Sequence, residues 1–196
     1  MAFHRFDAAD IAPMPWKNGG GATRELLSWP PGAGFDGFDW RVSLATIAQG
    51  GPFSAFPGID RTILLLDGPG VRLRSADGAV DHALDRPWRP FDFAGEAEVS
   101  ATLLGGPSVD FNLMVRRSRL RGEFVRVDAA SAFDAAPHGL LFVLAGHWQL
   151  DLDGAAAVCA PHQGVWWAGE PHRASVVPQG DGAALLAIRL APVTSP

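Results

Sequence analysis

The feature that most constrains the fold is the punctuation of this chain by turn residues. Its 196 residues include 23 glycines and 16 prolines, which separate short runs of strand-like composition. Residues 40–47 alternate apolar and polar side chains with the period of two that is typical of a half-buried strand. Similar runs recur about every ten residues, and helical periodicity is scarcely sustained, which is typical of a β-sandwich or barrel. The other candidate strands are residues 62–66, 71–74, 99–104, 124–127, 140–145, 148–152, 164–167, 175–177 and 185–190. We predict an all-β fold.

Two parts of the chain resemble each other. The hexapeptide FDFAGE at 91–96 is echoed by VWWAGE at 165–170, and TILLLDG at 62–68 is echoed by LFVLAG at 141–146. In both copies an apolar strand ends in glycine, and a hairpin and a second strand lead to an aromatic-Ala-Gly-Glu turn. Because self-similarity of this kind indicates repeated structural units, we predict two copies of one β-domain.

The second copy resembles the cupin pattern, a small antiparallel jelly-roll barrel. Gly146 and Pro171-His172 occupy the positions where that pattern has the glycine that ends a strand and a Pro-His pair at the barrel mouth. We therefore expect two tandem cupin-like (jelly-roll) barrels, a bicupin. The N-terminal domain is expected over residues 1–117 and the C-terminal domain over 118–196, with residues 116–136 as the passage between them.

Composition limits the class of protein. Hydrophobic residues make up 47% of the chain and charged residues 19%, which fits an ordinary globular protein. The formal net charge is −5 and no long basic run is present, so nucleic-acid binding is disfavoured. Cys159 is the only cysteine, which excludes an internal disulfide, and its apolar surroundings indicate a core residue. No apolar stretch approaches the length of a membrane span or a signal peptide, so we expect a cytoplasmic protein without a membrane partner.

Polar chemistry is concentrated in three short segments, residues 15–25, 51–61 and 110–117. Each mixes glycine or proline with amide, hydroxyl or basic side chains, as a small-molecule site assembled from loops requires. A phosphate-binding loop is disfavoured, because Lys17 precedes the glycines and no GK[ST] follows. The alternative interpretation is a glycine-rich turn with solvated basic side chains.

The whole chain resembles the HutD/Ves family of bicupins, of which HutD is linked to histidine utilisation. The resemblance depends on WKNGGG at 16–21 with TRE at 23–25, WRVS at 40–43, GPFS at 51–54 with FPGIDR at 56–61, and DFNLM at 110–114. Beyond residue 120 only the general cupin pattern matches. The resemblance implies a two-domain cupin fold with a ligand pocket.

A binder of a small anionic metabolite is the function that we expect. Arginine and lysine match carboxylates, and amides and hydroxyls supply neutral hydrogen bonds. Family membership favours a carboxylate of the histidine pathway, urocanate or N-formylglutamate, with ligand-dependent feedback on the pathway. The expected ligand-binding residues are Trp16, Lys17, Asn18, Arg24, Ser54, Phe56, Arg61 and Asn112, with Trp16 and Phe56 as apolar walls.

The alternative is a metal-dependent cupin enzyme, an isomerase, hydrolase or oxygenase. The metal-ligand positions of the N-terminal copy hold no imidazole, and the C-terminal copy offers only His172 and His138 at those positions. Because a transition metal usually needs three or more protein ligands, we expect no metal, no cofactor and no catalytic residue. A partner-binding domain and a homodimer with tryptophan at its interface are further alternatives, although tryptophan is more often a core residue.

Two carboxylates stand beside arginines in the sequence, Asp60 beside Arg61 and Asp110 near Arg116. Neighbours of this kind are often structural ion pairs. The competing interpretation of Arg61 is accordingly a structural residue that pairs with Asp60 or with another buried carboxylate.

Overall fold

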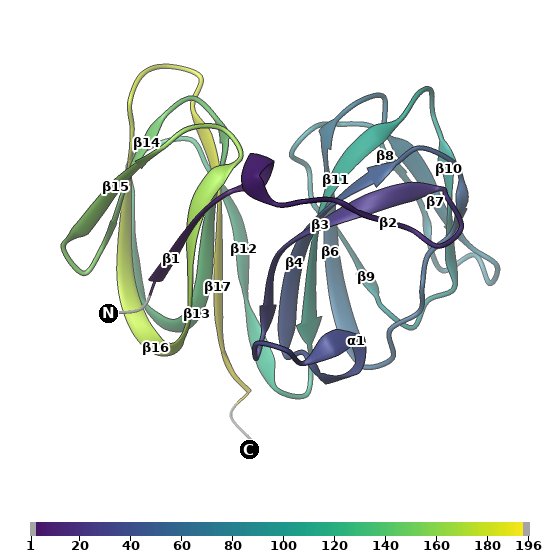
Figure 1. The fold of residues 1–196 in the computed structure, drawn as a ribbon, viewed down its shortest axis with the longest axis horizontal. Coiled ribbons are helices and arrows are strands. Elements are labelled where there is room, and N and C mark those ends of the chain that lie inside the picture. Colours follow the sequence, from purple (N-terminus) through teal and green to yellow (C-terminus); the bar gives the residue numbers. More distant parts are fainter. Residues whose placement is uncertain (1–2, 194–196) are drawn as a thin grey trace. The chain divides into compact units, whose positions relative to one another are not determined.

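The computed structural model describes residues 3–193, and strands make up almost all of its regular structure (Figure 1). Contacts divide the chain into two compact units. The N-terminal unit comprises residues 11–119, and the C-terminal unit comprises residues 3–10 together with 120–193. These units differ from the domains expected over 1–117 and 118–196, because the first strand belongs to the second unit and the boundary follows Arg119.

The N-terminal unit contains two antiparallel sheets. The first has the strand order β2-β3-β4-β11-β6-β9 and the second the order β5-β10-β7-β8. A four-residue helix, α1 (Gly34–Gly37), connects β3 to β4. The strands of the six-stranded sheet are β2 (Met14–Pro15), β3 (Gly21–Trp29), β4 (Trp40–Ile47), β6 (Ile59–Asp67), β9 (Phe91–Ala94) and β11 (Ser108–Arg116). Those of the other sheet are β5 (Gly51–Pro52), β7 (Val71–Ser75), β8 (Asp81–Leu84) and β10 (Val99–Leu103).

The core of this unit is formed by alternate residues of both sheets. Ile63 and Leu65 of β6 are buried in one cluster with Val71 and Leu73 of β7. Because side chains alternate between the faces of a strand, Leu64 lies on the opposite face of β6. We call the face that carries Ile63 and Leu65 the inner face of the six-stranded sheet.

The C-terminal unit is one seven-stranded antiparallel sheet with the order β12-β17-β13-β16-β14-β15, and β1 pairs with β16. Figure 1 shows β1 running along β16, and a 3-10 helix, η1 (Ala8–Asp10), follows it. Trp148 and Trp167 are fully buried in its core. The strands are β1 (Phe3–Asp7), β12 (Leu120–Val127), β13 (Ser131–Ala145), β14 (Trp148–Leu152), β15 (Ala155–Cys159), β16 (Gln163–Pro178) and β17 (Ala184–Pro192).

The register of both units agrees with the internal repeat. Ile63 pairs with Phe91 in the N-terminal unit, and Leu141 pairs with Val165 in the C-terminal unit. The sequence alignment of the two copies matches these same residues. It also places Gly139, which pairs with Trp167, at the position of Arg61. A Cβ at residue 139 would overlap the indole of Trp167. The Trp167 ring of the C-terminal unit therefore occupies the place where the Arg61 side chain begins in the N-terminal unit.

The expected all-β fold is confirmed, but several strand assignments are corrected. β3 and β11 lie in segments that were expected as loops. The passage over residues 116–136 contains β12, which is longer than the strand expected over 124–127, and the start of β13. The polar face of β11 explains the error, because Asp110 and Asn112 face the interior where apolar residues are the rule. Within residues 3–193, no helix combines the length and the apolar character that a membrane span demands.

Candidate functional site

Polar side chains lie on the inner face at the centre of the six-stranded sheet. Met114 of β11 pairs with Arg41 on one side and with Arg61 on the other. Residues that pair directly across antiparallel strands point to the same face, so both arginines lie on the inner face. Asn112 follows two residues away on β11 and shares that face.

Arg61 is buried and its guanidinium is surrounded by aromatic rings. Only 7% of the residue is exposed. Its Nη2 donates a hydrogen bond to Asn112 Oδ1 at 3.2 Å, and its Nε lies 3.4 Å from the same oxygen. The guanidinium carbon lies 4.9 Å, 5.2 Å and 6.0 Å from the ring centroids of Phe93, Phe53 and Phe56. Burial, and then the charge of Arg41, lower the pKa of Arg61 to about 10, so the side chain stays charged at neutral pH.

Arg41 brings a second guanidinium to this face. Its Nε donates to Glu25 Oε2 at 2.6 Å, its Nη1 lies 3.8 Å from Met114 Sδ, and its guanidinium stacks over Phe35. We call Arg41, Arg61 and Asn112 the arginine cluster. The only ion pair that the cluster makes with residues 3–193 is the one between Arg41 and Glu25, so one buried positive charge lacks a carboxylate partner. Such an arrangement favours an anion.

Asp110 lies on the same inner face, two residues from Asn112 on β11. It is 0% exposed, and neither carboxylate oxygen has a hydrogen-bond partner among the described residues. Burial raises the pKa of Asp110 to about 7, because an unpaired charge is costly away from water. A buried polar group without a partner is rare in folded proteins, which makes this carboxyl a candidate for ligand contact.

The structure brings three of the predicted ligand-binding residues together. Arg61 contacts both Asn112 and Phe56 through the interactions described above. Trp16 packs against the cluster that contains Ile63 and Leu65, and its Nε1 donates to Thr23 Oγ1 at 2.8 Å. The contacts of Arg61 therefore include Asn112 and Phe56, whereas Trp16 bonds to Thr23 near the other end of the sheet.

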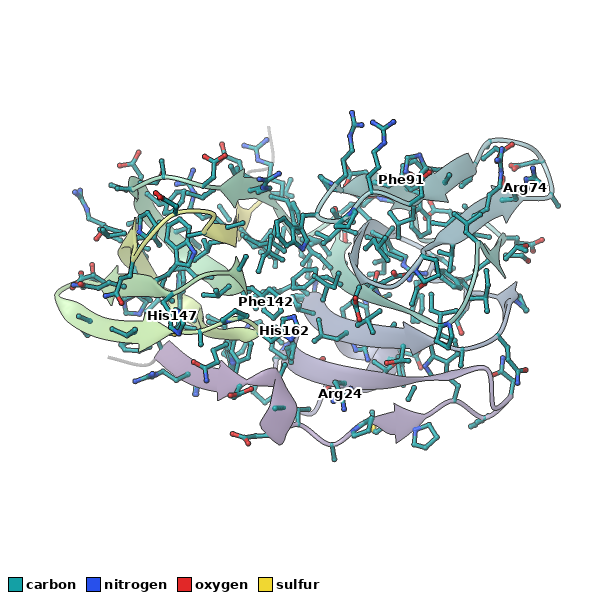
Figure 2. All side chains as sticks on the ribbon, turned by 90° about the horizontal axis from the view of Figure 1, so that it is seen from above. Arg24, Arg74, Phe91, Phe142, His147 and His162 are labelled. Carbon is teal, nitrogen blue, oxygen red and sulfur yellow. The ribbon has the colours of Figure 1, made fainter. Side chains whose placement is uncertain are left out.

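Four other predicted residues lie away from the arginine cluster. Lys17 and Asn18 are exposed in the turn between β2 and β3, where the Asn18 side chain accepts a hydrogen bond from Gly20 N. Ser54 is exposed after β5. Arg24 pairs with Leu44 and so lies on the face opposite to Arg61, where its Nε donates to the carbonyl of Ile11 at 3.1 Å. Figure 2 labels Arg24 on its strand.

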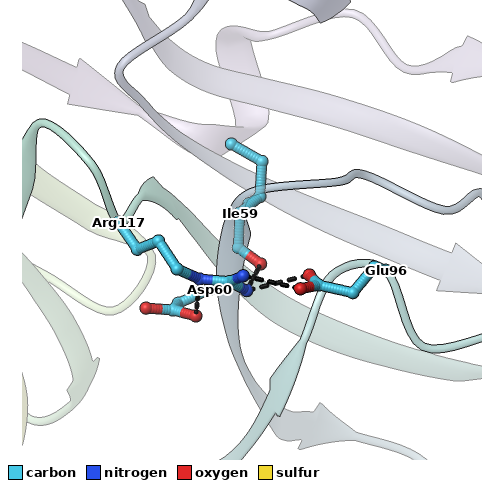
Figure 3. A network of polar contacts seen from close by, with 4 residues as sticks. All are labelled: Ile59, Asp60, Glu96 and Arg117. Atoms are coloured by element: carbon cyan, nitrogen blue, oxygen red, sulfur yellow. Dashed lines mark hydrogen bonds and ion pairs between the residues drawn. The ribbon is translucent and has the colours of Figure 1, made fainter.

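The ion pairs differ from the expected ones. Asp60 is bound by Arg117, which also binds Glu96 through both oxygens and donates to the carbonyl of Ile59 (Figure 3). Arg116 does not pair with Asp110, because its guanidinium donates to the carbonyls of Phe38 and Asp36. The expectation of two neighbouring Asp-Arg pairs is therefore wrong for both carboxylates.

The histidines of the C-terminal unit are not grouped. His172 Nδ1 lies 2.7 Å from Asp153 Oδ2, and His162 stacks with Phe142 at a centroid distance of 6.0 Å (Figure 2). Across residues 3–193, no group of three His, Cys, Asp or Glu side chains has an arrangement that could hold a metal ion.

A surface cavity of about 490 Å³ lies beside β8, away from the arginine cluster. It is lined by His82, Ala83, Leu84, Asp85, Arg86, Arg89 and Pro90. Its two arginines are exposed, and the His82 ring is stacked on Phe91.

Sequence reasoning missed Arg41, Phe53 and Phe93 as members of the site. The alternation of residues 40–47 already placed Arg41 and Ser43 on one face, but that face was taken as the solvated one. Phe53 lies in the GPFS motif and Phe93 in the FDFAGE repeat, but neither pattern indicated a place beside Arg61, and Phe93 comes to lie opposite Arg61 only through the pairing of β6 with β9.

Comparison with known proteins gives one consistent result. The family model described as HutD matches residues 8–186. Protein Ves from Cronobacter sakazakii is 42% identical over 162 residues, covering 81% of this chain and 84% of the relative. A Pseudomonas putida protein described as an uncharacterized 21.2 kDa protein in the hutC 3′ region is 42% identical over 151 residues, covering 75% and 76%.

Solved structures agree with this result. HutD from Pseudomonas fluorescens SBW25 superposes with a TM-score of 0.82 at 33% identity, covering 98% of this chain and all of that one. A cupin 2 conserved barrel domain protein from Leptotrichia buccalis shares the fold, with a TM-score of 0.60 at 10% identity over 97% of this chain and 96% of that one.

Proposed function

Because the chain belongs to the HutD family, we propose that it binds a small carboxylate metabolite of histidine catabolism and modulates that pathway through the bound form. Urocanate and N-formylglutamate are the candidate ligands. The description of the Pseudomonas putida relative by its place beside hutC supports the link to histidine utilisation.

The observation that carries this proposal is the buried guanidinium of Arg61. It stays charged at neutral pH, and no carboxylate within residues 3–193 forms an ion pair with it. A charge that is buried without a partner is costly, and a ligand carboxylate would compensate it. Arginine suits this task because its planar fork can hold both oxygens of a carboxylate.

The surroundings of Arg61 suit a small organic acid. Phe53, Phe56 and Phe93 provide apolar surface around the guanidinium, while Asn112 supplies a neutral polar group. Small-molecule sites generally combine an apolar lining with a few fixed polar groups. Inorganic anions lack the apolar body that this lining would cover.

A thermal-shift screen followed by calorimetric titration tests the proposal. Urocanate, N-formylglutamate, histidine and sodium sulfate should be titrated into the wild-type chain, because a ligand that binds only the folded state raises its apparent stability. We expect one of the two carboxylate metabolites to bind and Arg61→Lys to weaken it. Arg74→Lys is the matched control, because Arg74 is exposed and pairs with Asp81 on the other sheet. Saturable binding that is unchanged by Arg61→Lys would contradict the assignment.

A further inference from the structure

Asp110 is the one feature of the inner face that binding of a carboxylate at Arg61 does not explain. A second negative group near an anion site opposes anion binding unless it has a separate task. We propose that Asp110 determines the specificity of this site by accepting a hydrogen bond from an N–H group of the ligand. The ligand class is then a small carboxylic acid that carries an N–H donor at the end opposite to its carboxylate. This inference rests on the proposed binding of a carboxylate by Arg61.

The spacing of the residues on β11 sets the size of such a ligand. Asn112 receives the Arg61 hydrogen bond, and Asp110 lies two residues further along the strand on the same face. Two residues of a strand span about 6–7 Å. A molecule of that length could therefore place its carboxylate at Arg61 and an N–H group at Asp110.

The neighbours of Asp110 on the two adjacent strands form no hydrogen bond with its oxygens. Across β4 and β6 it pairs with Ala45 and Leu65, neither of which has a polar side-chain atom. Thr23, which pairs with Ala45, accepts the hydrogen bond from Trp16 and donates none to Asp110.

Neither arginine of this face forms a hydrogen bond to Asp110. Arg41 binds Glu25, and Arg61 binds Asn112. No described side chain therefore satisfies Asp110, although the residue is completely buried.

The energetics favour a donor over an acceptor on the ligand. A buried group without a hydrogen bond loses the hydration that it has in the unfolded chain, and a ligand N–H would restore that interaction. With the pKa of Asp110 near 7, the carboxyl can lose its proton at neutral pH when a donor arrives. An ionised acceptor also makes a stronger hydrogen bond than a neutral one.

Matched ligand pairs provide the test. Urocanate is compared with 3-(1,3-thiazol-4-yl)acrylate, in which sulfur replaces the imidazole N–H and the second ring nitrogen is kept. N-formylglutamate is compared with 2-(formyloxy)glutarate, in which an ester oxygen replaces the amide N–H. Each compound is titrated into the wild type, Asp110→Leu and Asp110→Asn. Asp110→Asn keeps the shape of the side chain and provides a variant that folds if Asp110→Leu does not.

For the matched pair that binds, we expect the wild type to bind the N–H ligand at least about 10-fold more tightly than its analogue. This ratio corresponds to the loss of one hydrogen bond to a charged group. Asp110→Leu should abolish that preference while it changes the affinity of the analogue less than about 3-fold. Asp110→Asn should reduce the preference, because an amide oxygen accepts less strongly than a carboxylate.

Three results would overturn the inference. If both members of a pair bind the wild type equally, and Arg61→Lys weakens the binding of both, Arg61 binds the carboxylate but Asp110 does not recognise an N–H group. If the preference for the N–H ligand survives in both Asp110 variants, the Asp110 carboxyl does not bind the ligand N–H and has a structural role. If none of the four compounds binds, the proposed function itself fails, and this inference fails with it.

Discussion

Arg61 donates to a single acceptor, Asn112 Oδ1, from both Nε and Nη2 at 3.4 Å and 3.2 Å. Both distances are at or beyond the long end of the usual range for N–H···O hydrogen bonds. A guanidinium has five N–H donors, and this one makes no other hydrogen bond to residues 3–193. Asn112 thus orients Arg61 across the sheet while it leaves most of the donor capacity of the arginine unused.

Replacing Arg61 by alanine should weaken carboxylate binding by about 1.5–3 kcal/mol, because a charge-assisted contact is lost. Calorimetric titration measures the affinity, and urea unfolding of the ligand-free protein measures the free energy of unfolding. Stability should change little or rise, because the substitution removes a buried charge that lacks a carboxylate partner. A large loss of stability with unchanged affinity would show that Arg61 has a structural role.

Asp110 should make the stability of the protein depend on pH. Its pKa is raised from an ordinary value of 3.8 to about 7 in the folded state, so the folded chain binds the proton more tightly than the unfolded chain. Stability from this group is therefore fully present below pH 4 and is lost as the pH rises toward 7 and above, by up to about 4 kcal/mol. Asp110→Asn should remove this loss.

Urea unfolding of both proteins at a series of pH values gives the measurement. The free energy of unfolding of the wild type minus that of Asp110→Asn should fall as the pH rises through this window. A difference that stays constant from acidic to mildly alkaline pH would show that Asp110 has an ordinary pKa.

Gly139→Ala should destabilise the protein, because the added Cβ would overlap the indole of Trp167. Overpacking of this kind costs about 1–3 kcal/mol. Gly106→Ala is the control, since a Cβ there meets no atom within 4 Å. Thermal unfolding of the two variants should show a lowered Tm for Gly139→Ala alone, and equal Tm values would contradict the close packing of β13 against Trp167.

Arg117→Ala should cause a small loss of stability that shrinks with added salt. Arg117 binds Asp60 and Glu96 at the surface, and it holds the pKa of Glu96 down at about 2 through a hydrogen bond. Exposed ion pairs are screened by ions, so the difference in Tm from the wild type should be smaller at about 1 M salt than at about 0.05 M salt. Arg117→Lys serves as the control that keeps the charge. A loss that does not depend on salt would point to the hydrogen bond with the Ile59 carbonyl instead.

Much of the fold could be predicted because it depends on local patterns. The alternation over residues 40–47 predicted β4 with its bounds, and the repeat placed Ile63 and Leu141 at equivalent positions. β11 was missed although its residues alternate, because both faces of the strand are buried and its polar residues Asp110 and Asn112 lie in the interior together with the apolar ones. Local pattern alone does not tell which face of a strand is turned inward.

The sequence by itself determined the all-β class, the duplication and the family, because turn residues, period-two alternation and motif spacing are all properties of neighbouring residues. It also marked Arg61, Asn112 and Phe56 as candidates. Only the tertiary structure decided which polar residues meet. Pairing of β4, β11 and β6 sets Arg41 and Arg61 on either side of Met114 and turns Arg24 to the opposite face. Strand register depends on contacts between residues far apart in the chain, so a side chain shares a site with others only once its strand has found its partners.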